Sequence, residues 1–227
     1  MADPAFGAFG KIPSVGDFFR IAAPPGFVTA WDEWLQKCLV AGTMAFGDRW
    51  DELYMSTPIW RFNLSAGLVG PSAMLGILMP SVDRVGRRFP LTLMAEVEAD
   101  VPPIVSHAAN TATFEALEGL ALAALDDDAT KDGLAEGLSG VRAENPKTEA
   151  HYRAGARAFL LSHDGPADAS TALALSAQMN RSFTNISVWS AALDGDTRMM
   201  ICEGLPDGPN VQGLYDIDAD YWKDSRL

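Results

Sequence analysis

Cysteine, histidine and long apolar runs are all scarce in this chain of 227 residues. Two cysteines, Cys38 and Cys202, are too few for a disulfide framework or a zinc site, so we expect buried thiols in a reducing compartment. No apolar run approaches the ~20 residues that a helix needs to cross a bilayer. The N-terminus has no basic start followed by an apolar stretch, so we expect no secretory signal. Together these absences predict a soluble, cytoplasmic protein without membrane insertion.

Sequence motifs for catalysis, nucleotide binding and metal binding are also absent. The three histidines follow no metal-ligand spacing and lie in no catalytic motif: His107, His151 and His163. Ser14 and Asp17 would need a nearby base to form a catalytic triad, and the chain has no G-x-S-x-G elbow. Gly10 and Lys11 lack the earlier glycine and the following Ser or Thr of a phosphate-binding loop. We therefore predict no enzyme, no cofactor and no metal site.

Positive charge is scarce in the second part of the chain. The net charge is −13, and it is unevenly distributed. Residues 1–93 hold eight Lys or Arg and eight Asp or Glu, whereas residues 94–227 hold nine and twenty-two. Nucleic acids and anionic membranes both require a basic face, so we expect neither as a partner. The acidic remainder, 94–227, either keeps the protein soluble or steers a basic partner, and we favour the first role.

Apolar periodicity predicts one mixed β-sheet covered by helices. Strands are expected over 6–12, 59–65, 72–80, 89–97 and 156–162, with a terminal hairpin of 182–193 and 197–205 around a turn at 194–196. Helices are expected over about 24–42, 44–55, 104–125 and 169–178, with a short helix inside the polar segment 126–150. The strands over 72–80 and 89–97 are close enough in sequence to pair as antiparallel neighbours. The two groups of strands, with helices between them, favour a three-layer α/β sandwich formed by a single domain over 1–227.

Aromatic residues indicate which helix face is buried. Apolar residues recur at spacings of three and four in the first helix: Phe27, Ala30, Trp31, Trp34, Leu35 and Cys38. Trp31 and Trp34 are therefore expected in the core rather than on a binding surface. Gly42 is expected to end this helix. Trp222, beside the charged C-terminal tail, is the tryptophan that we expect to be exposed.

The segment 9–20, FGKIPSVGDFFR, combines glycine, proline, charge and phenylalanine. We predict a strand that ends near Ile12, a turn over 13–16, and a buried aromatic anchor at Phe18 or Phe19. Asp17 is expected to accept hydrogen bonds from N–H groups of the turn or to pair with an arginine of the 83–88 loop. A pair between Asp17 and one of these arginines would bring the segment 9–20 and the 83–88 loop together in space.

The segment 79–93, MPSVDRVGRRFPLTL, places a charged loop between two apolar strands. In one interpretation, Arg84, Arg87 and Arg88 together bind a carboxylate or a phosphorylated group. In the other, Asp83 pairs with one arginine, the others hold backbone carbonyls, and Gly86 allows a left-handed turn. We favour the structural interpretation and keep the first as an alternative.

Five motifs in this order resemble the TagF family, also called ImpM, of type VI secretion-associated proteins. They are FGKIPSVGDFFR, PPGFVTAWDEWL, DRWDELYMSTPIWRF, LMPSVDRVGRRFPLTL and NISVWS. The resemblance is dense over 6–97 and thinner beyond, where SVW at 187–189 is the main remaining signature. It implies a three-layer α/β sandwich and a regulatory role rather than an enzymatic one.

The resemblance also implies partners. TagF-like proteins are cytoplasmic accessory factors, and some act as post-translational repressors of secretion by binding the forkhead-associated scaffold protein of the system. In some bacteria the domain is fused to a PP2C-type phosphatase, so any phosphatase partner of this chain is expected to be a separate protein. The family supplies no catalytic residues to carry over.

The motifs nevertheless nominate residues for a binding surface. The candidates are Lys11, Asp17, Arg20, Ser81, Asp83, Arg84, Arg87 and Arg88. The leading hypothesis is a regulator that binds a component of a type VI secretion system. The alternative is a sensor of a small anion or a phosphopeptide that uses the arginines of the 80–90 loop. Whether the motif residues hold the fold or form the binding surface stays open from the sequence.

Overall fold

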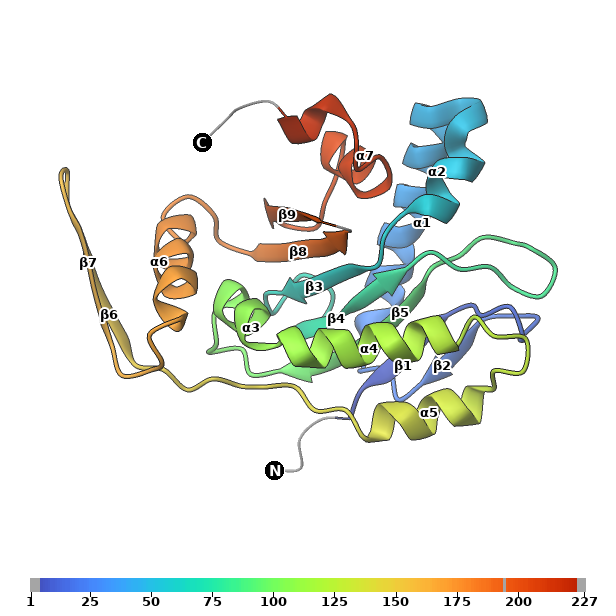
Figure 1. The fold of residues 1–227 in the computed structure, drawn as a ribbon, viewed down its shortest axis with the longest axis horizontal. Coiled ribbons are helices and arrows are strands. Elements are labelled where there is room, and N and C mark those ends of the chain that lie inside the picture. Colours follow the sequence, from blue (N-terminus) through green and yellow to red (C-terminus); the bar gives the residue numbers. More distant parts are fainter. Residues whose placement is uncertain (1–4, 194, 224–227) are drawn as a thin grey trace.

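The computed structural model describes residues 5–193 and 195–223 and has a layered α/β architecture (Figure 1). The strands are β1 (Gly7–Gly10), β2 (Phe19–Ile21), β3 (Trp60–Leu64), β4 (Ala73–Met79), β5 (Leu91–Val97), β6 (Ala150–Ala154), β7 (Phe159–His163), β8 (Ile186–Leu193) and β9 (Asp196–Glu203). The α-helices are α1 (Phe27–Phe46), α2 (Trp50–Ser56), α3 (Pro103–Ala109), α4 (Thr111–Ala123), α5 (Lys131–Ser139), α6 (Ala169–Met179) and α7 (Pro209–Tyr215). Two 3₁₀ turns, η1 (Gly47–Arg49) and η2 (Asp220–Lys223), complete the description.

Seven strands form one sheet in the order β2-β1-β5-β4-β3-β8-β9. Every described pairing in it is antiparallel, so the predicted mixed sheet is wrong in this respect. The physical reason is that β3, β4 and β5 follow one another through loops, whereas parallel neighbours need a long crossover connection. The expected pairing of the strands over 72–80 and 89–97 is confirmed, with Gly76 opposite Met94.

Helices cover both faces of this sheet, which confirms the three-layer α/β sandwich. On one face, α1, α2 and α7 pack on an apolar cluster that includes Trp31, Phe62 and Trp189. On the other face, α4 and α5 cover a second cluster around Leu93 and Phe114. Figure 1 shows α4 and α5 in front of the sheet and α1 behind it. On the same face as α4 and α5, helices α3 and α6 cover the part of the sheet next to β8.

Helix α1 follows the predicted face but continues past its predicted end. Its expected core residues are buried except for a half-buried Ala30: Phe27, Trp31, Trp34, Leu35 and Cys38. Gly42 does not end the helix, which continues to Phe46. A Cβ at Gly42 would lie 2.1 Å from the Trp50 ring. The role of Gly42 is to let α2 approach closely. The helix ends at Phe46, and the next residue, Gly47, has a φ of 53°. The continuous helix predicted over 44–55 is therefore divided among the end of α1, η1 and α2.

The helix predicted over 104–125 is divided into α3 and α4 at Asn110. The Asn110 side chain is buried and donates to the carbonyl oxygens of Ser106 (2.8 Å) and Glu144 (2.9 Å). It also accepts from the Glu144 N–H at 2.7 Å. An asparagine that satisfies backbone groups in this way competes with the helical hydrogen bonds. It also ties the segment after α5 to the junction between α3 and α4.

The segment 150–163 forms a separate two-stranded sheet of β6 and β7. We call it the hairpin arm. The strand predicted over 156–162 exists as β7, but its expected place in the central sheet is wrong, and its partner β6 was not predicted. All five residues of β6 are exposed, so no buried face marked it as a strand. In Figure 1 the arm extends from the body beside α6.

The C-terminal part of the chain completes the central sheet. The predicted hairpin is confirmed as β8 and β9, while Asp194 of its turn lies outside the described residues. Helix α7 was not predicted. Trp222 is half-buried rather than exposed, and its ring stacks on Trp60 with centroids 6.1 Å apart. The single domain over 1–227 stays a prediction, which the continuous sheet and shared core favour. Among the described residues, no helix is both long and apolar enough to span a membrane.

Candidate functional site

Two loops that carry the longest sequence motifs meet at one end of the sheet. One follows β1 (residues 11–18) and the other joins β4 to β5 (residues 80–90), and we call them the paired loops. Lys11 Nζ lies 3.0 Å from Asp83 Oδ2, although 72 positions separate the two residues. Both side chains are buried. The two motif segments therefore meet in space, although the contact is formed by Lys11 and Asp83 and not by the Asp17–arginine pair on which the prediction depended.

Asp83 organises the paired loops through both of its carboxylate oxygens. Oδ1 accepts the N–H groups of Val85 (3.0 Å) and Arg87 (2.9 Å), and Oδ2 accepts Lys11 Nζ and Arg87 Nε (2.6 Å). Burial by itself raises the pKa of Asp83. The hydrogen bonds from Arg87, Lys11 and Val85 outweigh that effect and hold the pKa well below its usual range. The carboxylate is thus a permanent charge that fixes the loop.

Ser81 joins the base of the loop to α2. Its Oγ donates to the Lys11 carbonyl at 2.8 Å, and its own carbonyl accepts from the Tyr54 hydroxyl at 2.8 Å. The Phe89 N–H donates to the same carbonyl at 3.0 Å. Burial raises the pKa of Tyr54, which keeps this hydroxyl protonated and able to donate. Ser81 is consequently a structural contact beneath the surface.

The three arginines of the loop do not converge on one point. Arg87 uses one guanidinium nitrogen to donate to the Gly16 carbonyl at 2.9 Å. Arg88 forms an ion pair with Asp51 of α2 at 2.7 Å. Arg84 is exposed and lies against Gly16, where an added Cβ would be 3.2 Å from its guanidinium. Arg87 pairs with Asp83 as the favoured interpretation expected, whereas Arg88 pairs with the Asp51 carboxylate rather than with a backbone carbonyl. Arg84 is exposed.

The end of the first motif differs in part from expectation. The Asp17 carboxylate is exposed and accepts the Phe18 N–H at 2.8 Å, so it bonds to backbone and does not pair with an arginine. Phe19 is the buried anchor, whereas Phe18 is 48% exposed. Arg20 belongs to the unpredicted strand β2 and lies over the Phe9 ring, 5.7 Å from its centroid. These placements leave Asp17, Phe18 and Arg20 on the surface.

An apolar and cationic surface covers this buried network. Phe18 is 48% exposed and Val85 is 71% exposed. Lys11 Nζ lies 4.7 Å from the centroid of the Phe18 ring, and that ring meets Phe89 edge-on at 4.7 Å. Arg84 flanks them. Exposed aromatic and arginine side chains on a fixed support are typical of residues that dominate protein interfaces.

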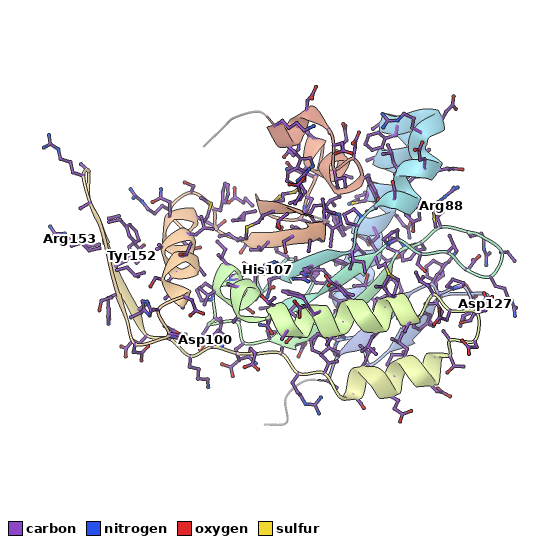
Figure 2. All side chains as sticks on the ribbon, in the orientation of Figure 1. Arg88, Asp100, His107, Asp127, Tyr152 and Arg153 are labelled. Atoms are coloured by element: carbon purple, nitrogen blue, oxygen red, sulfur yellow. The ribbon has the colours of Figure 1, made fainter. Side chains whose placement is uncertain are left out.

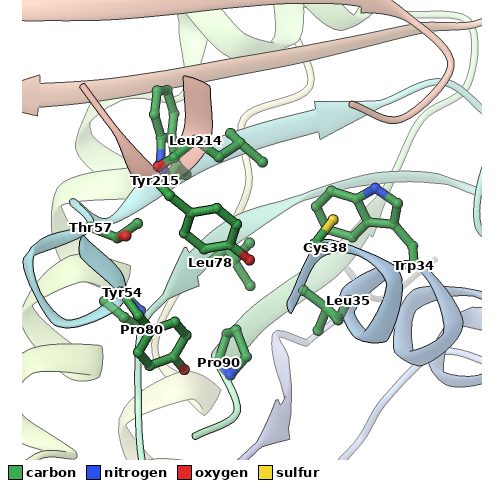
Figure 3. A pocket seen from close by; sticks show the side chains of 11 residues that line it. Trp34, Leu35, Cys38, Tyr54, Thr57, Leu78, Pro80, Pro90, Leu214 and Tyr215 are labelled. Carbon is green, nitrogen blue, oxygen red and sulfur yellow. The ribbon is translucent and has the colours of Figure 1, made fainter. Parts of the chain in front are cut away.

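A small apolar cavity lies behind the paired loops (Figure 3). Its volume is about 20 Å³, which is room for about one water molecule. Trp34, Cys38, Tyr54 and Tyr215 are among the residues that line it. Burial raises the pKa of the Cys38 thiol to about 12, so this cysteine is protonated and unreactive. The cavity is too small for a ligand and belongs to the core.

A buried polar network on the opposite face of the sheet was missed in the sequence. Asn63 Nδ2 donates to Ser106 Oγ at 2.9 Å, which leaves Asn63 Oδ1 to accept from His107 Nδ1 at 2.9 Å. His107 Nε2 then accepts from the Ser190 hydroxyl at 2.7 Å. Figure 2 marks His107 at the junction of α3 with the sheet. No sequence motif signals this contact, because 83 positions separate His107 from Ser190.

This serine–histidine–asparagine arrangement is poorly suited to catalysis. Burial, assisted by the positive charge of Arg61, lowers the pKa of His107 to about 3. An imidazole with so low a pKa is a weak base toward the Ser190 hydroxyl. The group at Nδ1 is an amide rather than a carboxylate, so it does not stabilise an imidazolium. The network instead satisfies polar groups where α3 packs on β3 and β8.

Metal ligands are not gathered in the described residues, 5–193 and 195–223. No group of three or more His, Cys, Asp or Glu side chains within these ranges could hold a metal ion.

Comparisons with known proteins agree with the paired-loop motifs. The family described as the TagF N-terminal domain, type VI secretion system-associated, matches residues 7–141. The chain belongs to the TagF family. This match includes both paired loops and ends before the hairpin arm. No curated protein sequence matches the chain.

A solved structure extends the similarity beyond the TagF N-terminal match. The crystal structure of PA0076 from Pseudomonas aeruginosa PAO1, at 2.05 Å resolution, superimposes on this TagF-family chain with a TM-score of 0.77. The two sequences are 28% identical, and the superposition covers 95% of this chain and 96% of the other. The fold is thus shared over almost the whole length.

Proposed function

We propose that this TagF-family protein is a non-enzymatic, cytoplasmic regulator of a type VI secretion system. It acts as a post-translational repressor or accessory factor by binding the forkhead-associated scaffold protein of the system. The binding surface is the exposed part of the paired loops, with Phe18, Val85 and Arg84 at its centre. A separate PP2C-type phosphatase is a second partner under this proposal, in keeping with its fusion to related domains.

One observation carries the proposal: an exposed apolar and cationic surface is fixed from below by a buried ionic network. The Asp83 carboxylate is fully buried and holds both Lys11 and Arg87. A surface that is ordered before binding loses little conformational entropy when a partner docks. Phe18, Val85 and Arg84 lie at the exposed end of the paired loops, and their side chains offer contacts to a partner rather than an acid–base pair.

The anion-sensor alternative has less support. A site for a phosphate or carboxylate would need several cationic groups aimed at one point. Arg87 and Arg88 are instead directed to Asp83 and Asp51, respectively. Arg84 is the one arginine of the 80–90 loop without an ion pair among the described contacts. A single exposed arginine is better suited to the edge of a protein interface.

Binding to the scaffold protein encoded in the same genome tests the proposal. The purified chain is titrated against the full-length scaffold by calorimetry, together with the variants Phe18→Ser and Arg84→Glu. Each variant is expected to weaken binding by about tenfold or more, because each removes a central contact. Arg84 is exposed, so its variant should keep the thermal midpoint of the wild type. Phe18→Ser also loses the contacts of the ring with Phe89 and Lys11, so its midpoint should fall modestly while the protein stays folded.

A charge-matched control is Lys37→Glu, on the exposed side of α1. This variant should bind the scaffold as the wild type does. The proposal is wrong if the wild-type protein does not bind the scaffold, or if Phe18→Ser and Arg84→Glu bind no more weakly than Lys37→Glu. Deletion or overexpression of the chain should also change secretion in cells.

A further inference from the structure

The hairpin arm carries exposed apolar side chains at a place where the body of the protein does not cover them. Tyr152 is 51% exposed, Phe159 is 37% exposed and Leu160 is 59% exposed. The Tyr152 and Phe159 rings stack on each other with centroids 5.7 Å apart. Figure 2 shows Tyr152 and Arg153 on the extended part of the arm, away from the central sheet. Such a group of exposed apolar residues typically marks an interaction surface.

Only the base of the arm is attached to α6. Leu161 packs against the small cluster that contains Leu173, and a ring nitrogen of His163 lies 2.8 Å from Ser170 Oγ. The described residues provide no third strand, so both outer edges of the β6–β7 sheet are unpaired. An isolated two-stranded hairpin is marginally stable in water, and an unpaired edge is a template for another strand.

The charge of the arm is opposite to that of the chain as a whole. Residues 150–163 contain two arginines, Arg153 and Arg157, and no aspartate or glutamate. The acidic residues nearest in sequence are Glu149 and Asp164, at the base of the arm. The backbone N–H of Glu149 donates to the Asp164 carboxylate at 2.9 Å, and the Glu149 carboxylate lies 3.8 Å from His151 Nε2. The surrounding part of the chain, 94–227, has a large excess of acidic residues. An isolated positive segment on an acidic protein fits an acidic target.

We propose that the hairpin arm is a docking element for a protein partner with an extended, acidic and apolar segment. The partner segment pairs with one open edge of the β6–β7 sheet as a third strand. Its apolar side chains pack on the faces that carry Tyr152, Phe159 and Leu160, and its carboxylates meet Arg153 and Arg157. Affinity comes from backbone hydrogen bonds and apolar burial, while the arginines supply selectivity for acidic partners.

Charge favours this partner over an anionic membrane and over a second copy of the chain. An anionic membrane is an extended surface and would repel a protein of net charge −13 that approached it through two arginines. Two arms that paired with each other would bring Arg153 and Arg157 of both copies together. A local acidic segment of another protein avoids both sources of repulsion.

The arm is independent of the paired loops. Figure 1 shows the arm at the left edge of the molecule and the loop between β4 and β5 at the right edge. The arm also lies outside residues 7–141, which the TagF N-terminal domain matches. Loss of binding at one surface therefore leaves the other intact, and the two proposals fail separately.

The test uses the full chain and two labelled synthetic peptides of about eight residues. One alternates valine with glutamate, and the other alternates valine with lysine. Fluorescence anisotropy is expected to show binding of the glutamate peptide at least about tenfold tighter than binding of the lysine peptide. Amide hydrogen exchange should slow over 150–163 when the glutamate peptide is bound.

Two variants identify the contributions of the arm. The double variant Arg153→Glu, Arg157→Glu should bind the glutamate peptide about tenfold more weakly and should favour the lysine peptide. Phe159→Ser should weaken binding of both peptides. Arg181→Glu, exposed just beyond the other end of α6, is the charge control and should behave as the wild type.

The remaining outcomes would overturn the proposal. Absence of glutamate-peptide binding, or binding without protection of 150–163, excludes the arm as this docking element. Arm-dependent binding to phosphatidylglycerol vesicles that exceeds peptide binding would assign the arm to a membrane. Sedimentation as a dimer that the double variant abolishes would assign the arm to a second copy of this chain.

Discussion

Acidification between pH 7 and pH 5 is expected to destabilise the protein through His107. The pKa of this buried imidazole is about 3 in the fold, compared with 6.5 for an ordinary histidine. Between these two values the unfolded chain binds a proton that the folded chain does not. The free energy of unfolding therefore falls as the pH falls, by about 1.4 kcal/mol for each pH unit below the unfolded pKa.

The expected loss is about 2 kcal/mol between pH 7 and pH 5, since pH 5 lies about 1.5 units below the unfolded pKa. This window is above the range in which most carboxylates protonate, so their contribution to the pH dependence is small. Urea unfolding curves at the two pH values measure the difference directly. His107→Gln removes the titrating group and should remove most of this pH dependence, although it lowers stability at pH 7.

The control for this experiment is His151→Gln on the hairpin arm. The His151 side chain is 81% exposed, so its replacement should keep the wild-type pH dependence. An equal free energy of unfolding at pH 7 and pH 5 in the wild type would refute the reasoning. The same conclusion would follow if His107→Gln retained the full pH dependence.

Two further pairs of substitutions test the packing and the ionic network. Asp83→Asn should lower the thermal midpoint strongly, because it removes the negative charge that Lys11 and Arg87 share, whereas Asp17→Lys should leave the midpoint nearly unchanged. Differential scanning calorimetry distinguishes these results, and unfolding of Asp17→Lys would contradict its exposed position. Gly42→Ala should destabilise the protein by about 1–3 kcal/mol, because its Cβ would meet the Trp50 ring. Gly119→Ala, on α4 with nothing within 4 Å, should be neutral or stabilising in the same denaturation assay.

The sequence was sufficient for elements with a strong buried periodicity. Trp31, Leu35 and Cys38 recur at helical spacing, and the structure buries all three on one face of α1. The central strands were also predicted, because their residues are largely buried and apolar. The strand β6 was missed because both of its faces are exposed, so no alternation of burial distinguishes it. Gly42 was misread because its role depends on Trp50, which belongs to the next helix.

The candidate site could be predicted only in outline. The sequence linked the meeting of the two motif segments to a pair between Asp17 and an arginine, yet the structure forms the contact through Lys11 and Asp83. Loop geometry decides which group of the first motif binds Arg87. The Arg87 guanidinium donates to the Gly16 carbonyl rather than to the Asp17 carboxylate. The His107 network was out of reach, because it joins three elements that are distant in sequence and follows no motif.

Amide hydrogen exchange of the full chain, alone and saturated with the forkhead-associated scaffold, is the most direct test of the central claim. The account predicts slower exchange over 13–18 and 84–88, the parts of the paired loops that are not buried. Unchanged exchange in both segments under saturating scaffold would contradict the claim. Slower exchange confined to 150–163 would also contradict it, while it would leave the hairpin arm as the docking element.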